Sequence, residues 1–197
     1  MGQFQNICIY CGSSDKTDAE YLQAAEDMGG ALVARGLKLI YGGGSTGMMG
    51  ALADAVLENG GEVVGVIPKM FETPELLHTG LTELHVVGDI NTRKTIMAEM
   101  SDAFVALPGG FGTFDELFEI LTWAQIGLHR NPIGILNTRE YFTPLLALIE
   151  HARQEGFIYN EHIDLLIDEA DPHVLLTRME GFEPPPNMER WVQRNHD

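Results

Sequence analysis

The chain has 197 residues, of which 45% are hydrophobic and 21% charged, and these proportions are typical of a globular domain with a sizeable core. Its formal net charge of −17 repels the phosphate backbone of nucleic acids and anionic membrane surfaces, so neither is expected as a partner. No apolar run is long enough to span a bilayer, and residues 1–6 lack the features of a signal peptide, which predicts a cytoplasmic protein.

Short apolar runs alternate along the chain with helical patterns. Strands are expected at residues 6–10, 37–41, 62–67, 83–87, 103–107, 133–136 and 165–167. Helices are expected at residues 18–35, 46–59, 91–101, 113–128, 141–155 and 172–179. Several strands are apolar at consecutive positions, as in parallel sheets that helices cover on both faces. The pattern predicts a Rossmann-like α/β fold, a doubly wound and mostly parallel sheet, in a single domain over residues 1–182 with a Pro-containing tail at 183–197.

The first strand ends in a C-x-x-C formed by Cys8 and Cys11. This spacing occurs in redox pairs and in half of a zinc site. However, strand positions three apart face opposite sides of a sheet and lie ~10 Å apart, and the chain has no second pair of cysteines. We interpret both as small apolar side chains and predict no metal site. Ser13 follows at the carboxyl end of this strand, where such sheets bind ligands, and is a candidate substrate contact.

The second strand is followed by a glycine turn in which Gly42, Gly44 and Gly47 match the G-x-G-x-x-G of dinucleotide-binding folds. The acidic residue that usually ends the next strand is missing from 66–69, which disfavours NAD or FAD. A P-loop is excluded because no G-K-[ST] follows. A tight turn without a ligand remains the alternative. We favour one wall of a nucleotide cleft, with Gly43 and Gly44 as candidate contacts.

The helix at 91–101 carries Arg93, Met97 and Met100 on one face. A cation beside soft apolar side chains suits a phosphate or ribose together with an aromatic base. The alternative is a surface arginine above a core methionine stripe. Lys94 is included among the candidate contacts, although it points to another side of the helix and better suits a solvated charge or an interface.

The most informative segment is the run at 107–116, Leu-Pro-Gly-Gly-Phe-Gly-Thr-Phe-Asp-Glu, which follows a buried strand and opens a helix. Its glycines let the backbone turn tightly and expose N–H groups, and a helix N-terminus favours negative charge. This predicts an anion site with the candidate contacts Gly109, Gly110, Gly112 and Thr113.

Glu116 adds a carboxylate one turn into that helix. Thr113 and Glu116 have the spacing of a capping box, so a structural role competes with a catalytic one. Asp115 diverges from Glu116 by about 100° around the helix, so the two are not expected to act as an acid/base pair.

The helix at 113–128 is apolar nearly all round, whereas a helix buried on one face needs only a stripe. A second buried face is therefore expected, most simply the contact of a symmetric homodimer. None of the four lysines has a context that marks a pyridoxal phosphate Schiff base, and no cofactor is predicted.

Three segments in this order, residues 41–50, 92–97 and 108–116, resemble the Lonely Guy (LOG) family, whose signature is P-G-G-x-G-T-x-x-E. Its members are cytokinin riboside 5'-monophosphate phosphoribohydrolases, although many have been labelled lysine decarboxylases. The resemblance implies a Rossmann-like homodimer that hydrolyses the N-glycosidic bond of an adenosine 5'-monophosphate, often N6-substituted. It further implies that Arg93 and Glu116 are the catalytic residues and that Gly109 to Thr113 hold the 5'-phosphate. The competing hypothesis is a nucleotide-binding or sensing module that uses the same pocket without hydrolysis.

Overall fold

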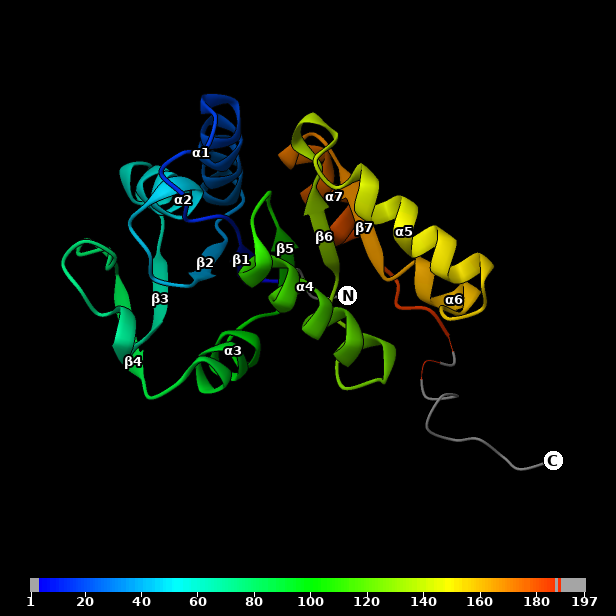
Figure 1. The fold of residues 1–197 in the computed structure, drawn as a ribbon. Coiled ribbons are helices and arrows are strands. Elements are labelled where there is room, and N and C mark those ends of the chain that lie inside the picture. Colours follow the sequence, from blue (N-terminus) through cyan, green and yellow to red (C-terminus); the bar gives the residue numbers. More distant parts are fainter. Residues whose placement is uncertain (1–3, 187, 189–197) are drawn as a thin grey trace.

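The structure is a computed structural model that describes residues 4–186 and 188. A seven-stranded sheet forms its centre, with the strand order β4-β3-β2-β1-β5-β6-β7 and every pair parallel (Figure 1). The strands are β1 Asn6–Tyr10, β2 Lys38–Tyr41, β3 Val63–Pro68, β4 Glu83–Val87, β5 Ala103–Ala106, β6 Ile133–Leu136 and β7 Leu166–Glu169. This is the doubly wound, Rossmann-like α/β fold that the sequence predicts.

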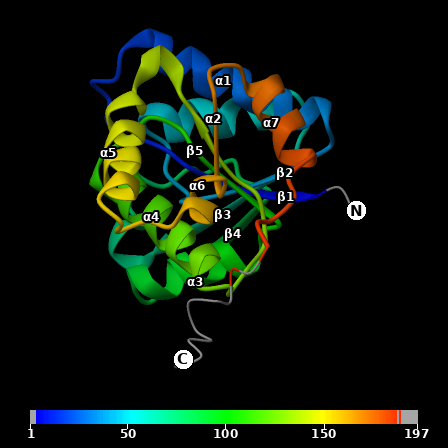
Figure 2. The same ribbon diagram turned by 90° about the vertical axis from the view of Figure 1, so that its right-hand side faces the viewer.

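Helices cover both faces of the sheet. They are α1 Ala19–Ala34, α2 Gly47–Glu58, α3 Ile90–Glu99, α4 Phe111–Gln125, α5 Thr143–Gln154, α6 Asn160–Ile163 and α7 Pro172–Glu180, with short 3-10 helices η1 Lys69–Phe71 and η2 Thr138–Glu140. Helices α1, α2 and α7 lie on one face, and α3, α4 and α5 lie on the other (Figure 2). Among the described residues, none of these helices combines the length and apolar character needed to cross a membrane.

Alternating residues of the strands pack into two separate hydrophobic cores, one on each face of the sheet. Along β1, Ile7 and Ile9 pack under α1, α2 and α7, while Cys8 and Tyr10 pack under the helices of the other face. Cys11 belongs to the first core, so the two cysteines of the C-x-x-C face opposite sides of the sheet. Both thiols are free and buried, as the interpretation as apolar side chains requires.

The boundaries of most elements lie within two residues of those predicted from the sequence. The short helix α6 and the two 3-10 helices have no counterpart in the prediction, because segments of three or four residues carry no hydrophobic periodicity. Of the predicted tail at 183–197, only 183–186 and 188 lie within the described residues.

Candidate active site

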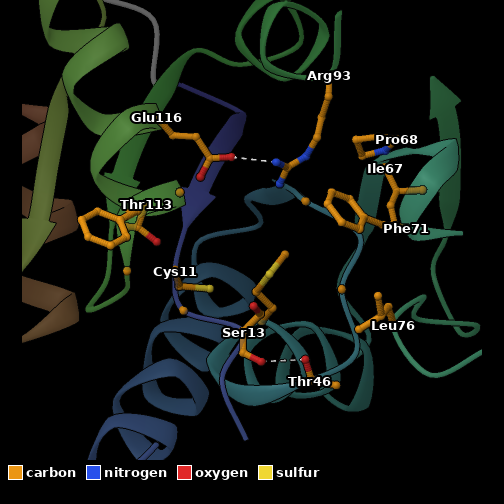
Figure 3. Close-up of a pocket in the computed structure, with 17 residues that line it drawn as sticks. Cys11, Ser13, Thr46, Ile67, Pro68, Phe71, Leu76, Arg93, Thr113 and Glu116 are labelled. Atoms are coloured by element: carbon orange, nitrogen blue, oxygen red, sulfur yellow. Dashed lines mark hydrogen bonds and ion pairs between the residues drawn. The ribbon is translucent and has the colours of Figure 1, made fainter. Parts of the chain in front are cut away.

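The strand order places a switch point between β1 and β5, because the chain builds the sheet outward from this pair in opposite directions. Three turns meet there. The Gly12 N–H donates to the Pro108 carbonyl at 3.0 Å, which joins the turns after β1 and β5. The Thr46 hydroxyl donates to the Ser13 carbonyl at 2.7 Å, which joins the turn after β1 to the glycine turn after β2 (Figure 3). The turns after β1, β2 and β5 therefore converge at one edge of the sheet.

A cavity of about 460 Å³ opens between these turns, within the range of small-molecule sites. It is lined by Cys11, Gly12, Ser13, Gly42, Gly44, Thr46, Met49, Ile67, Pro68, Phe71, Leu76, Arg93, Gly110, Phe111, Gly112, Thr113 and Glu116. Figure 3 shows two unlike sides: Thr113 and Glu116 face an apolar side made by Ile67, Phe71 and Leu76. The cavity thus offers hydrogen-bonding groups to one part of a ligand and apolar surface to another.

Arg93 and Glu116 meet at the top of this cavity in Figure 3, although they come from different helices. Arg93 Nη1 lies 3.0 Å from Glu116 Oε1, and both side chains are largely buried. A second contact fixes the guanidinium, because Arg93 Nε donates to the Val66 carbonyl of β3 at 3.1 Å. The pair therefore ties α3, α4 and the end of β3 together at the cavity.

Gly42 makes the space that the Arg93 guanidinium occupies. A Cβ atom at position 42 would lie 1.9 Å from Arg93 Nη2 and 2.7 Å from Met49 Cε. Any side chain there would displace the guanidinium. The first glycine of the G-x-G-x-x-G match thus leaves room for the side chain of Arg93.

Burial dominates the electrostatics of Glu116, whose exposed fraction is 7%. Loss of hydration raises the pKa of its carboxyl above the ordinary value, and the neighbouring Arg93 guanidinium opposes this shift. The result is a largely buried carboxyl group that forms an ion pair with Arg93. Such a group suits electrostatic stabilisation and proton transfer.

The glycine run after β5 opens α4, with Gly110 as the N-cap. Residues 110–113 therefore supply N–H groups that have no acceptor within the helix, and all four line the cavity. Gly109 packs beneath them, where a Cβ atom would lie 2.1 Å from Thr113 Oγ1 and 2.9 Å from the Gly12 nitrogen. These amides and the helix dipole favour a negatively charged ligand, which is the property that the predicted anion site requires.

The capping-box alternative for Thr113 and Glu116 is wrong. Helix α4 begins two residues earlier than predicted, at Phe111, so Thr113 lies in its first turn rather than at the N-cap. No side chain caps this helix at Gly110. Glu116 therefore pairs with Arg93 instead of the backbone at position 113.

The structure brings seven of the eleven candidate residues to the cavity: Ser13, Gly44, Arg93, Gly110, Gly112, Thr113 and Glu116. The other four lie beside it or below it. Met97 has no exposed surface and belongs to the core under α4. Lys94 forms ion pairs with Asp115 at 2.9 Å and Glu119 at 3.1 Å, so it joins α3 to α4.

Gly43 and Gly109 support the cavity from behind. The Gly43 carbonyl accepts from the His78 N–H at 3.0 Å, and φ at Gly43 is +75°, a conformation that favours glycine. The Gly109 carbonyl accepts a hydrogen bond from the Tyr141 hydroxyl. Both glycines fix the shape of a turn whose neighbours line the cavity.

Sequence reasoning missed most of the apolar lining: Cys11, Met49, Ile67, Pro68, Phe71, Leu76 and Phe111. Phe71 and Leu76 lie in the segment between β3 and β4, which has no periodicity and only one 3-10 turn. The Ser45 N–H donates to the Leu76 carbonyl at 2.8 Å, which holds this segment along the glycine turn. Ile67 and Pro68 follow the rule that strand ends line the site, and that rule would have found them.

The strand order, the cavity at the switch point and the amides at the start of α4 define an α/β protein with a candidate small-molecule site. The sequence family described as "Possible lysine decarboxylase" matches residues 49–179. A cytokinin riboside 5'-monophosphate phosphoribohydrolase of Rhodococcoides fascians is 53% identical over 155 residues, 78% of each chain. A probable enzyme of the same name from Oryza sativa subsp. japonica is 43% identical over 182 residues, 92% of this chain and 86% of that one. The chain belongs to this family, the LOG family.

The fold recurs in solved structures of low sequence similarity. The molybdenum cofactor carrier protein of Chlamydomonas reinhardtii superposes with a TM-score of 0.68 at 22% identity, covering 90% of this chain and 96% of that one. The molybdenum cofactor binding protein of Rippkaea orientalis gives 0.69 at 19% identity, covering 90% and 96%. These likenesses extend to the fold alone.

Proposed function

We propose that this protein hydrolyses the N-glycosidic bond of adenosine 5'-monophosphates, including N6-substituted ones, to the free base and ribose 5-phosphate. The observation that carries the proposal is the buried pair of Arg93 and Glu116, 3.0 Å apart at the edge of a cavity with an anion-binding helix start. The named activity of relatives at 43% and 53% identity supports the same reaction.

Glu116 acts on the ribose in this proposal. When the C1'–N9 bond breaks, its electron pair leaves with the purine and positive charge builds on the ribose. A carboxylate facing the ribose stabilises this charge and orients the water that adds to C1'. The proton that this water loses balances the one that the departing base gains. The low exposure of Glu116 strengthens its interaction with the developing charge.

Arg93 has two tasks in the proposal. Its guanidinium favours the ionised form of Glu116, against the effect of burial. Since Arg93 also lines the cavity, it supplies donors for a phosphate or ribose oxygen. The hydrogen bond to the Val66 carbonyl keeps the guanidinium in place for both tasks.

The amides of residues 110–113 hold the 5'-phosphate in the proposal, with Thr113 and Ser13 as hydroxyl donors. The net charge of −17 repels anions at long range, so these local hydrogen-bond donors must supply the attraction for the phosphate. On the opposite side of the cavity, Ile67, Phe71 and Leu76 offer apolar surface to the base and to an N6-substituent.

Lysine decarboxylation, the activity in the family description, finds no support in the cavity. None of the 17 residues that line it, all within the described part of the chain, is a lysine that could bind pyridoxal phosphate. Lys94 on the neighbouring helix is engaged by Asp115 and Glu119.

The proposal includes a homodimer in the cytoplasm. Helix α4 and the residues that follow it expose three large apolar side chains, with exposed fractions of 92% for Phe111, 42% for Phe118 and 67% for Leu128. A symmetric contact would remove this surface from water, and Phe111 would bring it to the edge of the cavity. The free thiols of Cys8 and Cys11 are compatible with a reducing compartment. Replacement of Phe118 by Asp is expected to yield monomers in sedimentation experiments.

The test of the function is a panel of nucleotides. The protein is incubated with AMP, N6-isopentenyl-AMP, IMP and adenosine, and the free base and ribose 5-phosphate are quantified. Release of base from the adenosine monophosphates but not from adenosine supports the proposal. Tight binding of AMP without release of base contradicts it and indicates a binding module.

A further inference from the structure

A tyrosine outside the cavity is hydrogen bonded to the turn that opens the anion site. The Tyr141 hydroxyl donates to the carbonyl of Gly109, 32 residues earlier in the chain. Gly109 is followed directly by Gly110, the N-cap of α4, which lines the cavity. Tyr141 itself is not among the lining residues. The contact therefore lies outside the cavity and holds the residue directly before Gly110.

Neighbouring rings hold the Tyr141 ring in place. Phe142, with no exposed surface, meets it edge to face at 5.1 Å, and Tyr21 of α1 does the same at 6.0 Å. The backbone next to it is fixed too, since the Phe142 N–H donates to Asn137 Oδ1 at 2.7 Å. Tyr141 thus has little freedom to release Gly109.

The segment before Tyr141 has an unusual backbone. Arg139 and Glu140 adopt φ values of +54° and +58°, a left-handed conformation that residues other than glycine seldom adopt. Such a conformation persists only where surrounding contacts impose it. The Arg139 side chain reaches the start of α1, where its guanidinium lies 3.4 Å from carboxylate oxygens of Asp18 and Glu20 and 5.5 Å from the centre of the Tyr21 ring. These contacts connect the segment that carries Tyr141 to the start of α1.

The geometry of the peptide bond connects this contact to the cavity. In a planar trans peptide, the carbonyl of one residue and the N–H of the next point to opposite sides. A hydroxyl that holds the Gly109 carbonyl therefore directs the Gly110 N–H away from Tyr141. Glycine at both positions leaves this peptide otherwise free to turn.

We propose that Tyr141 is a positioning residue, whose hydroxyl fixes the Gly109–Gly110 peptide so that the Gly110 N–H donates to the 5'-phosphate of the substrate. The inference rests on the proposed function, which assigns this turn to the phosphate. Burial raises the pKa of Tyr141, so the hydroxyl stays protonated and remains a donor across the neutral range.

The test removes this hydroxyl alone. Tyr141→Phe keeps the ring contacts with Tyr21 and Phe142, and Tyr21→Phe is the control, because it removes a hydroxyl from the adjoining ring. Calorimetry measures the affinity of each protein for ribose 5-phosphate, which has the phosphate and is not turned over, and for adenosine, which lacks the phosphate. Steady-state kinetics with AMP gives kcat and KM separately. Thermal unfolding shows that each variant is folded.

We expect Tyr141→Phe to bind ribose 5-phosphate about fivefold to tenfold more weakly, which is the effect of losing the hydrogen bond from the Gly110 N–H to the phosphate. Its KM for AMP rises by the same factor, while its affinity for adenosine and its kcat stay within twofold, and Tyr21→Phe resembles the wild type. Equal binding of ribose 5-phosphate by wild type and Tyr141→Phe overturns the inference and leaves the proposed function intact. An equal loss for adenosine also overturns it, because that marks general damage to the site. A wild type that binds neither ribose 5-phosphate nor AMP overturns both.

Discussion

Gly42→Ala tests whether the position of the Arg93 guanidinium, rather than its mere presence, supports catalysis. The added methyl group would lie 1.9 Å from Arg93 Nη2. The nitrogen must therefore move by about 1.5 Å to reach 3.4 Å, the separation at which ordinary van der Waals contact begins. A shift of this size breaks or distorts the 3.0 Å contact between Arg93 and Glu116.

We expect Gly42→Ala to lower kcat/KM while leaving the stability of the fold almost unchanged. Displacing a catalytic group by about 1 Å can lower kcat/KM about 100-fold, which corresponds to about 2.7 kcal/mol of transition-state free energy. The atoms that must move are the ends of the flexible Arg93 and Met49 side chains, so the melting temperature is expected to change by only a few degrees. The assay measures release of free base from AMP, with thermal unfolding alongside.

Two controls separate this explanation from its rivals. Gly30→Ala lies in α1, where an added Cβ atom meets nothing within 4 Å, and should keep wild-type kcat/KM with unchanged or slightly higher stability. A double-mutant cycle compares the effect of Gly42→Ala in the wild type with its effect in Arg93→Ala, which lacks the guanidinium. If position 42 acts through Arg93, then Gly42→Ala costs little further activity in the Arg93→Ala background. Wild-type kcat/KM in Gly42→Ala, or a full additional loss in the double variant, refutes the reasoning.

Three further outcomes follow from burial. Since folding raises the pKa of Glu116, its ionised form carries a penalty that is absent below the unfolded value near 4.5 and grows as the pH rises toward the folded value. The free energy of unfolding of Glu116→Gln, measured in urea, should therefore increase relative to wild type as the pH rises above about 4.5; a difference independent of pH contradicts this. Burial also raises the pKa of Cys8 to about 12 and that of Cys11 further, so neither thiol of the native protein should react with iodoacetamide at pH 8, whereas both should react after unfolding. Met97→Leu should cost less than about 1.5 kcal/mol of stability and leave KM unchanged, because the side chain is in the core; a raised KM with normal stability would restore it as a substrate contact.

The sequence was sufficient for the sheet and for the three turns, because both depend on local patterns. Strands such as β5 are continuous apolar runs, and the turns contain glycines at strand ends, where the fold class places ligands. The start of α4 was misjudged because Thr113 and Glu116 have the spacing of a cap, whereas glycine residues of the turn continue into the helix and Gly110 takes the cap position.

Contacts between distant parts of the chain were beyond sequence reasoning. Only the resemblance to a family placed Arg93 and Glu116 in one site, since 23 positions separate them and no periodicity connects two helices; their pairing is seen in the structure alone. Met97 lies four residues after Arg93 on the same face of the helix. However, Arg93 lines the cavity, whereas Met97 is already buried in the core. Phe71 and Leu76 reach the cavity through an irregular segment that is fixed by backbone hydrogen bonds to the glycine turn.

The central claim is that the buried carboxylate of Glu116 promotes cleavage of the glycosidic bond. Replacement of Glu116 by Gln preserves shape and removes the charge, so the most direct measurement compares release of free base from AMP by the two proteins, together with their affinity for ribose 5-phosphate. We predict that Glu116→Gln binds ribose 5-phosphate as the wild type does and releases base about 10² to 10³ times more slowly. Release at the wild-type rate by a folded Glu116→Gln protein would contradict the assignment.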